Sequence, residues 1–112
     1  MSEAERAFNG KIFQCIDWAL GSLGEGVKQS FYHQMKERSN LTIDKFAARP
    51  LDMIQNLREI LGVAGSSIVE KMILREINSS FGMHLSPEIS FPEAVSEARK
   101  TFLTDARDKE VH

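Results

Sequence analysis

The residues best suited to catalysis in this chain are its single cysteine, Cys15, and the histidines His33 and His84. A cysteine next to a histidine can act as a nucleophile with its general base. However, Cys15 falls on one helical stripe with Ile12 and Ile16, where a cysteine packs as a small apolar side chain. The sequence therefore favours a core position for Cys15. We expect no catalytic residue and no enzyme activity.

Metal ligands are equally poorly supported. The histidines, at positions 33, 84 and 112, have no i, i+4 spacing and no cysteine neighbour, whereas zinc and iron sites need such a cluster. Glutamates 59, 70 and 76 each have a lysine or arginine next to them in sequence, which is typical of a solvated helix face. We expect no metal ligand and no cofactor.

The glycine-rich stretch 61–67, Leu-Gly-Val-Ala-Gly-Ser-Ser, could present backbone amides to a phosphate group. No strand is expected before it, and the P-loop lysine is missing after its second glycine. Gly62 instead suits the residue just past a helix end, where φ is positive. Gly65 allows a tight turn, and Ser66 or Ser67 can cap a following helix. The stretch therefore predicts a structural joint.

Another Leu-Gly joint occurs at 23–27, about 38 residues before the joint at 61–67. The glycines of the two joints are Gly24, Gly26, Gly62 and Gly65. This weak internal repeat indicates two similar αα-hairpins. The alternative is that both joints merely share the usual chemistry of helix ends.

Five runs of the chain have helical spacing of apolar residues, and they must carry any site. The expected helices run from Ser2 to about residue 21, from 25 to 38, from 50 to 61, from 66 to 81 and from about 91 to 109. One helical turn is expected to dock Ile43 and Phe46. No strand is expected. The prediction is an all-α, compact single domain over 1–112, with about five helices: two αα-hairpins plus a C-terminal helix.

The bulk properties exclude some classes of protein. A formal charge of -2 argues against a protein whose main task is to neutralise phosphates. The single cysteine cannot form an internal disulfide. The first residues lack the basic-then-apolar order of a signal peptide. Charges and glycines interrupt every apolar run, so none is long enough to span a membrane. We expect a cytoplasmic protein without a membrane segment.

A DNA-binding regulator with a helix-turn-helix-like unit is the alternative function. A recognition helix should begin with exposed basic or amide side chains, but the run after Gly65 begins Ser-Ser-Ile-Val-Glu-Lys. The basic residues between Lys36 and Arg49 are diluted by Glu37 and Asp44. Nucleic acid is therefore not the expected partner.

Three aromatic residues are candidates for binding a protein partner: Trp18, Tyr32 and Phe102. Trp18 is the best of them because it lies between the stripe positions 16 and 19. The last helix has a thin apolar stripe, which leaves open whether it packs on its own chain or on a neighbour. Because symmetric dimers are the commonest assembly, we expect a homodimer.

The segments 23–32 (Leu-Gly-Glu-Gly-Val-Lys-Gln-Ser-Phe-Tyr) and 57–77 resemble a small archaeal domain family named after Nitrosopumilus output domains. The resemblance extends over about residues 15–83. Leu61 and Gly26 depart from it, since the family often has phenylalanine and serine there. The resemblance implies an α-helical signalling output or stand-alone regulator, and it supplies no catalytic residues. We expect a non-enzymatic regulatory or protein-interaction module.

Overall fold

The computed structural model describes residues 2–111, with side chains up to residue 105, so His112 lies outside the described residues. The chain forms α1 (Glu3–Gly21), α2 (Glu25–Ser39), the short 3-10 helix η1 (Ile43–Lys45), α3 (Pro50–Phe81) and α4 (Phe91–Val111). No strand occurs between residues 2 and 111. The all-α class is confirmed. The expected count of about five helices is wrong, because the predicted third and fourth helices form α3 together.

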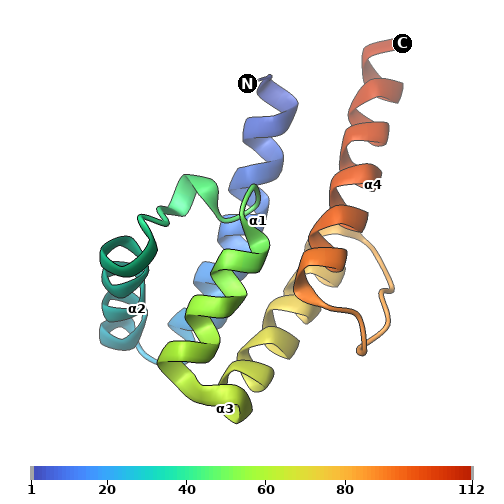
Figure 1. Ribbon diagram of the computed structural model, residues 1–112. Coiled ribbons are helices and arrows are strands. Elements are labelled where there is room, and N and C mark those ends of the chain that lie inside the picture. The colour runs from blue at the N-terminus through green and yellow to red at the C-terminus, as the bar shows by residue number, and fades with distance from the viewer. Residues whose placement is uncertain (1, 112) are drawn as a thin grey trace.

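The helices are arranged around one strong bend. Figure 1 shows both termini at one end of the molecule, with α1 and the first half of α3 running away from that end. α3 then bends, and its second half returns, followed by α4, which extends toward the end with the termini. α2 lies to one side of α1. The bend therefore makes a hairpin from a single helix.

Serine hydroxyls cap the starts of α1 and α4, and a proline begins α3. The Ser2 hydroxyl accepts a hydrogen bond from the Glu5 amide at 3.1 Å, and Ser90 accepts one from the Glu93 amide at 3.3 Å. Each bond satisfies an amide that has no partner within its own helix. Pro50 occupies the start of α3, where its missing amide hydrogen costs nothing.

Two of the four joint glycines make the turns. Gly24 precedes α2 with φ 118°, and Gly62 has φ 78° and ψ 172°, the one non-helical conformation inside α3. Gly26 and Gly65 lie within helices instead, so the expected turn at Gly65 is wrong. Ser66 is buried and donates to the Val63 carbonyl at 3.1 Å. Gly62 is thus the one non-helical residue between the two predicted helices, which form the two arms of α3.

The core joins α1, α3 and α4 around Phe8. The Phe8 ring lies 5.7 Å from that of Phe81 and 5.8 Å from that of Phe102, measured between ring centroids. The Arg99 guanidinium lies 4.7 Å from the Phe8 centroid, and it pairs with the Glu5 carboxylate. Aromatic packing and the guanidinium above the ring thus hold α4 against α1.

None of the helices described over residues 2–111 has both the length and the apolar character needed to cross a membrane.

Candidate functional site

The Cys15 thiol is in the core, 1% exposed. It donates to the Ser80 hydroxyl at 3.6 Å, and burial raises its pKa. A raised pKa keeps the thiol protonated at neutral pH, whereas the nucleophile is the thiolate. His33 lies on the exposed side of α2 and His84 lies in the exposed loop after α3. The geometry brings neither His33 nor His84 to Cys15.

This placement makes a direct prediction for thiol labelling. The folded protein is expected to leave Cys15 unmodified by a chromogenic thiol reagent over a time in which the denatured protein reacts completely, because the thiol is buried and protonated. The released chromophore is measured with and without denaturant. Rapid stoichiometric labelling of the folded protein would contradict the core position.

Among the side chains that the structure describes, no group of three or more histidine, cysteine, aspartate or glutamate residues could hold a metal ion.

A polar cleft of about 390 Å³ lies between α3 and the segment that leads into α4. Its charged side chains are balanced in sign: Arg58, Glu70, Lys71 and Glu88. Arg58 is already paired with Glu70, at 3.5 Å between nitrogen and oxygen. Balanced, partly paired charge gives this cleft no preference for either sign of ligand.

A second candidate site surrounds η1, and we call it the η1 groove. It consists of two hollows that share Ile43: one of about 270 Å³ between α2 and η1, and one of about 360 Å³ between α1 and η1. The first hollow is lined by Gln29, Tyr32, His33, Lys36, Leu41, Thr42, Ile43 and Phe46. The second is lined by Arg6, Asn9, Gly10, Phe13, Ile43 and Asp44.

The turn at η1 raises Ile43 between the two hollows. Leu41 and Phe46, on either side of it in sequence, are buried and fix the turn to the core. Ile43 is 42% exposed, so the expectation that it docks inward together with Phe46 is wrong for Ile43. Ile43 stays exposed because it borders a hollow on each side and not a packed helix. An apolar ridge between two hollows is a shape that can fit a partner's side chains.

An aromatic row forms the wall behind the ridge. The Tyr32 ring lies between Phe13 and Phe46, with centroid distances of 6.2 Å and 5.9 Å. Its hydroxyl donates to the Asp17 carboxylate at 2.8 Å, and Lys28 pairs with the same carboxylate at 3.2 Å. Burial, followed by the bond to Asp17, raises the pKa of Tyr32. The hydroxyl therefore stays neutral, and Tyr32 is a fixed wall rather than an acid or base.

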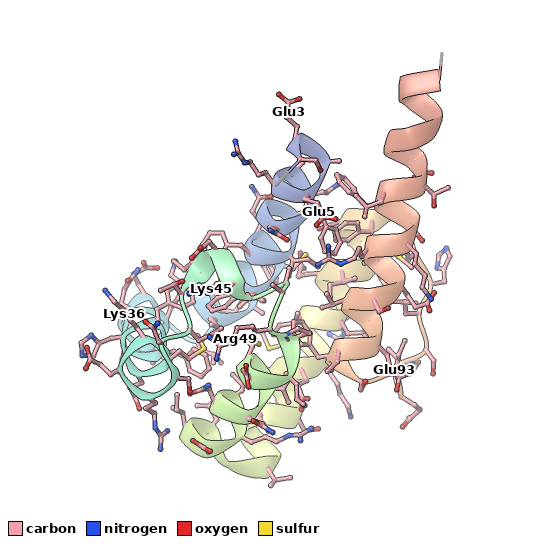
Figure 2. All side chains as sticks on the ribbon, turned by 45° about the horizontal axis from the view of Figure 1, so that its top comes forward. Glu3, Glu5, Lys36, Lys45, Arg49 and Glu93 are labelled. Carbon is pink, nitrogen blue, oxygen red and sulfur yellow. The ribbon has the colours of Figure 1, made fainter. Side chains whose placement is uncertain are left out.

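Cations without partners surround the η1 groove. Arg6 and Lys36 line the hollows and Lys45 belongs to η1, and none of the three has an ion-pair partner among the described side chains. Figure 2 shows Lys36 and Lys45 in the part of the molecule formed by α2 and η1. Arg49, labelled nearby, is instead paired with Asp52 at 2.7 Å.

The carboxylate at the η1 groove is that of Asp44. A hydrogen bond from the Thr42 hydroxyl lowers the pKa of Asp44, so this group is charged at neutral pH. Glu37 is next to Lys36 in sequence but lines neither hollow. Among the residues that line the two hollows, Arg6 and Lys36 therefore outnumber the one carboxylate, on a chain whose formal net charge is -2.

The three aromatic partner candidates lie at different places. Tyr32 lines the η1 groove. Trp18 is 59% exposed near the end of α1 and lines neither hollow of the groove. Phe102 is half-buried against Phe8 and Phe81. Sequence reasoning missed Ile43 as a surface residue, and the only available signal was the shortness of its helical turn.

Searches with protein-family models, of curated proteins and of solved structures found nothing that matches this chain. The resemblance to Nitrosopumilus output domains therefore stays a prediction from the quoted residues.

Proposed function

We propose that this chain is a non-enzymatic regulatory protein-interaction module, and that its η1 groove binds an acidic amphipathic segment of a partner protein. The observation that carries the proposal is the exposed Ile43 ridge between two hollows, with unpaired cations around it. The role of signalling output or stand-alone regulator belongs to the same proposal, supported by the resemblance to the output domain family. A reducing cytoplasm suits it, because Cys15 has no second cysteine to pair with.

The shape of the η1 groove suits side chains rather than a whole domain. Hollows of about 270 and 360 Å³ each accept one or two apolar side chains. A helix laid across Ile43 would place apolar residues one turn apart into the two hollows, which is the usual pattern for a helix in a groove. The aromatic wall of Phe13, Tyr32 and Phe46 offers those side chains a rigid contact.

The charge of the η1 groove selects the sign of the occupant. Arg6, Lys36 and Lys45 form no ion pair with a carboxylate in the described part of the chain, although Asp44 lines the same hollow as Arg6 and attracts Lys45. Acidic residues beside the occupant's apolar positions would face these cations, and complementary charge speeds association and fixes orientation. A basic segment would meet the same cations and be repelled.

The groove suits an acidic protein segment better than a nucleic acid. A nucleic-acid surface needs several cations along a phosphate path. The η1 groove instead contains the charged Asp44 carboxylate, which would repel a phosphate. The second half of α3, the candidate recognition helix, exposes Val63 and Ile68 near its start. DNA binding becomes one outcome of the test below.

A displayed library of random amphipathic helical peptides, selected on the folded protein, tests the proposal. We expect the enriched peptides to carry acidic residues beside apolar residues one helical turn apart. Their affinity, measured by fluorescence anisotropy, should fall as salt rises. Amide chemical shifts of the labelled protein should move along α1, α2 and η1 on titration.

Enrichment of basic peptides, or shifts confined to α4 and the bend of α3, would refute the proposal. Labelled duplex DNA, titrated at low salt, provides the competing outcome. If DNA binds and displaces the selected peptide, the cations serve phosphates, and the DNA-binding reading replaces the protein-interaction one.

A further inference from the structure

The polar cleft between α3 and the segment that leads into α4 is separate from the η1 groove. It has a volume of about 390 Å³ and shares no lining residue with either hollow of that groove. The second half of α3 supplies one wall, with Ser67, Glu70 and Lys71. The segment before α4 supplies the other wall, with Glu88 and Ile89. Figure 1 shows this segment returning beside the second half of α3.

The wall that carries Glu88 is fixed by hydrogen bonds to its backbone. The Asn78 side chain accepts from the Leu85 amide at 2.9 Å and donates to the Leu85 carbonyl at 3.4 Å. Ser86 then closes a turn, because its carbonyl accepts from the Ile89 amide at 3.1 Å and its hydroxyl from the Glu88 amide at 3.2 Å. A segment held in this way loses little conformational freedom when a ligand binds, which favours affinity.

The floor of the cleft is apolar. It is formed by Leu74, Phe91 and Ala94, which are 8%, 4% and 0% exposed. A cleft of about 390 Å³ lies within the ~300–1,000 Å³ range of small-molecule sites. Such sites combine an apolar lining with a few polar groups that orient the ligand. The floor therefore suits an apolar side chain, and the orienting groups must come from the walls.

The charges at the cleft are two cations and two carboxylates, of which only one cation and one carboxylate form a pair. Arg58 and Glu70 lie 3.5 Å apart between nitrogen and oxygen. Lys71 and Glu88 pair neither with each other nor with any other side chain that the structure describes. An anionic ligand would be repelled by Glu88, and a cationic ligand by Lys71. A ligand that carries both charges can pair with both walls.

We propose that this cleft binds a free α-amino acid with an apolar side chain. The carboxylate of the ligand faces Lys71, its ammonium group faces Glu88, and its side chain lies against Leu74 and Phe91. Ser67 precedes Lys71 by four residues on the same helix face, so its hydroxyl can also donate to the ligand carboxylate. This site goes beyond the partner binding proposed for the η1 groove, and either proposal can fail without the other.

A titration of isotopically labelled protein with leucine, valine and phenylalanine tests the proposal. We expect the amide chemical shifts of Ser67, Lys71, Ile89 and Ala94 to move, with a dissociation constant of ~1 mM or lower for the tightest ligand. N-acetylleucine lacks the ammonium group and leucinamide lacks the carboxylate. Each should bind about fivefold more weakly than leucine, which is the effect of a favourable exposed charge pair. Glycine has no side chain for the apolar floor and should also bind more weakly.

Two neutral variants assign the ligand's charges to the two walls. In Glu88→Gln, leucine should lose its advantage over N-acetylleucine and keep its advantage over leucinamide. In Lys71→Gln, leucine should instead lose its advantage over leucinamide alone. Glu97→Gln and Lys100→Gln are the matched controls, because these residues pair with each other on α4 outside the cleft, and leucine affinity should not change in them. All four side chains are exposed, so every variant should fold.

The proposal would be overturned if none of the three apolar amino acids moved the cleft amides at ~10 mM, well above the expected dissociation constant. Shifts confined to residues outside the cleft would overturn it as well. N-acetylleucine or leucinamide binding as tightly as leucine would show that the cleft does not use both charges. Glycine binding as tightly as leucine would show that the floor takes no side chain, and this result also contradicts the proposal.

Discussion

Replacing Ile43 with aspartate is expected to weaken binding of the selected acidic peptide about 30-fold or more, because central interface side chains contribute ~2 kcal/mol or more. The substitution removes the apolar ridge shared by the two hollows and adds a carboxylate that repels an acidic occupant. Fluorescence anisotropy with the labelled peptide measures the change. Since Ile43 is 42% exposed, the free energy of unfolding should change by less than about 1 kcal/mol.

Val63→Asp is the control for this experiment. Val63 is also an exposed apolar residue, but it lies at the bend of α3 and lines neither hollow. Peptide affinity should be unchanged in this variant. Equal losses from Ile43→Asp and Val63→Asp, or no loss from either, would show that the peptide does not use the η1 groove.

Replacing Phe8 with alanine is expected to lower the free energy of unfolding by about 3–5 kcal/mol, the usual cost of deleting a buried phenylalanine side chain. Phe8 is fully buried, and its ring contacts Phe81, Phe102 and the Arg99 guanidinium. The loss is a large part of the ~5–15 kcal/mol that stabilises a typical domain. Urea denaturation followed by circular dichroism measures it.

Trp18→Ala is the comparison for Phe8→Ala. Trp18 is larger than Phe8 but 59% exposed, so its removal should cost less than about 1 kcal/mol. If the two substitutions destabilise the protein equally, the core does not centre on Phe8. The same reasoning applies to Phe102. Because its ring contacts Phe8 and Phe81, truncating it to alanine should also lower the free energy of unfolding.

Local chemistry made much of the fold predictable. Ser2, Ser90, Pro50 and Gly82 set helix ends through caps, a missing amide hydrogen and a positive φ, all of which depend on adjacent residues. The Cys15 position followed from the helical period of its neighbours. Such features need no knowledge of the rest of the chain.

The positive φ of Gly62 was predicted from the sequence, but the helical conformation of Gly65 and the η1 groove were not predictable in the same way. Both Gly62 and Gly65 were expected to turn the chain, but only Gly62 leaves the helical conformation. Tertiary packing decides at which of the two glycines α3 bends. The η1 groove brings together Arg6, Lys36 and Ile43 from three elements. Periodicity within one element cannot show which side chains of another element lie beside it.

A charge-swap titration tests most directly whether charge complementarity and the Ile43 ridge together select an acidic segment, as we propose. Lys36→Glu should weaken binding of the selected peptide by about tenfold, since like charges across an interface repel. Replacing the peptide's facing acidic residue with lysine should restore the affinity toward this variant, while the same peptide should bind the unaltered protein poorly. Affinities that do not depend on either charge would contradict the account.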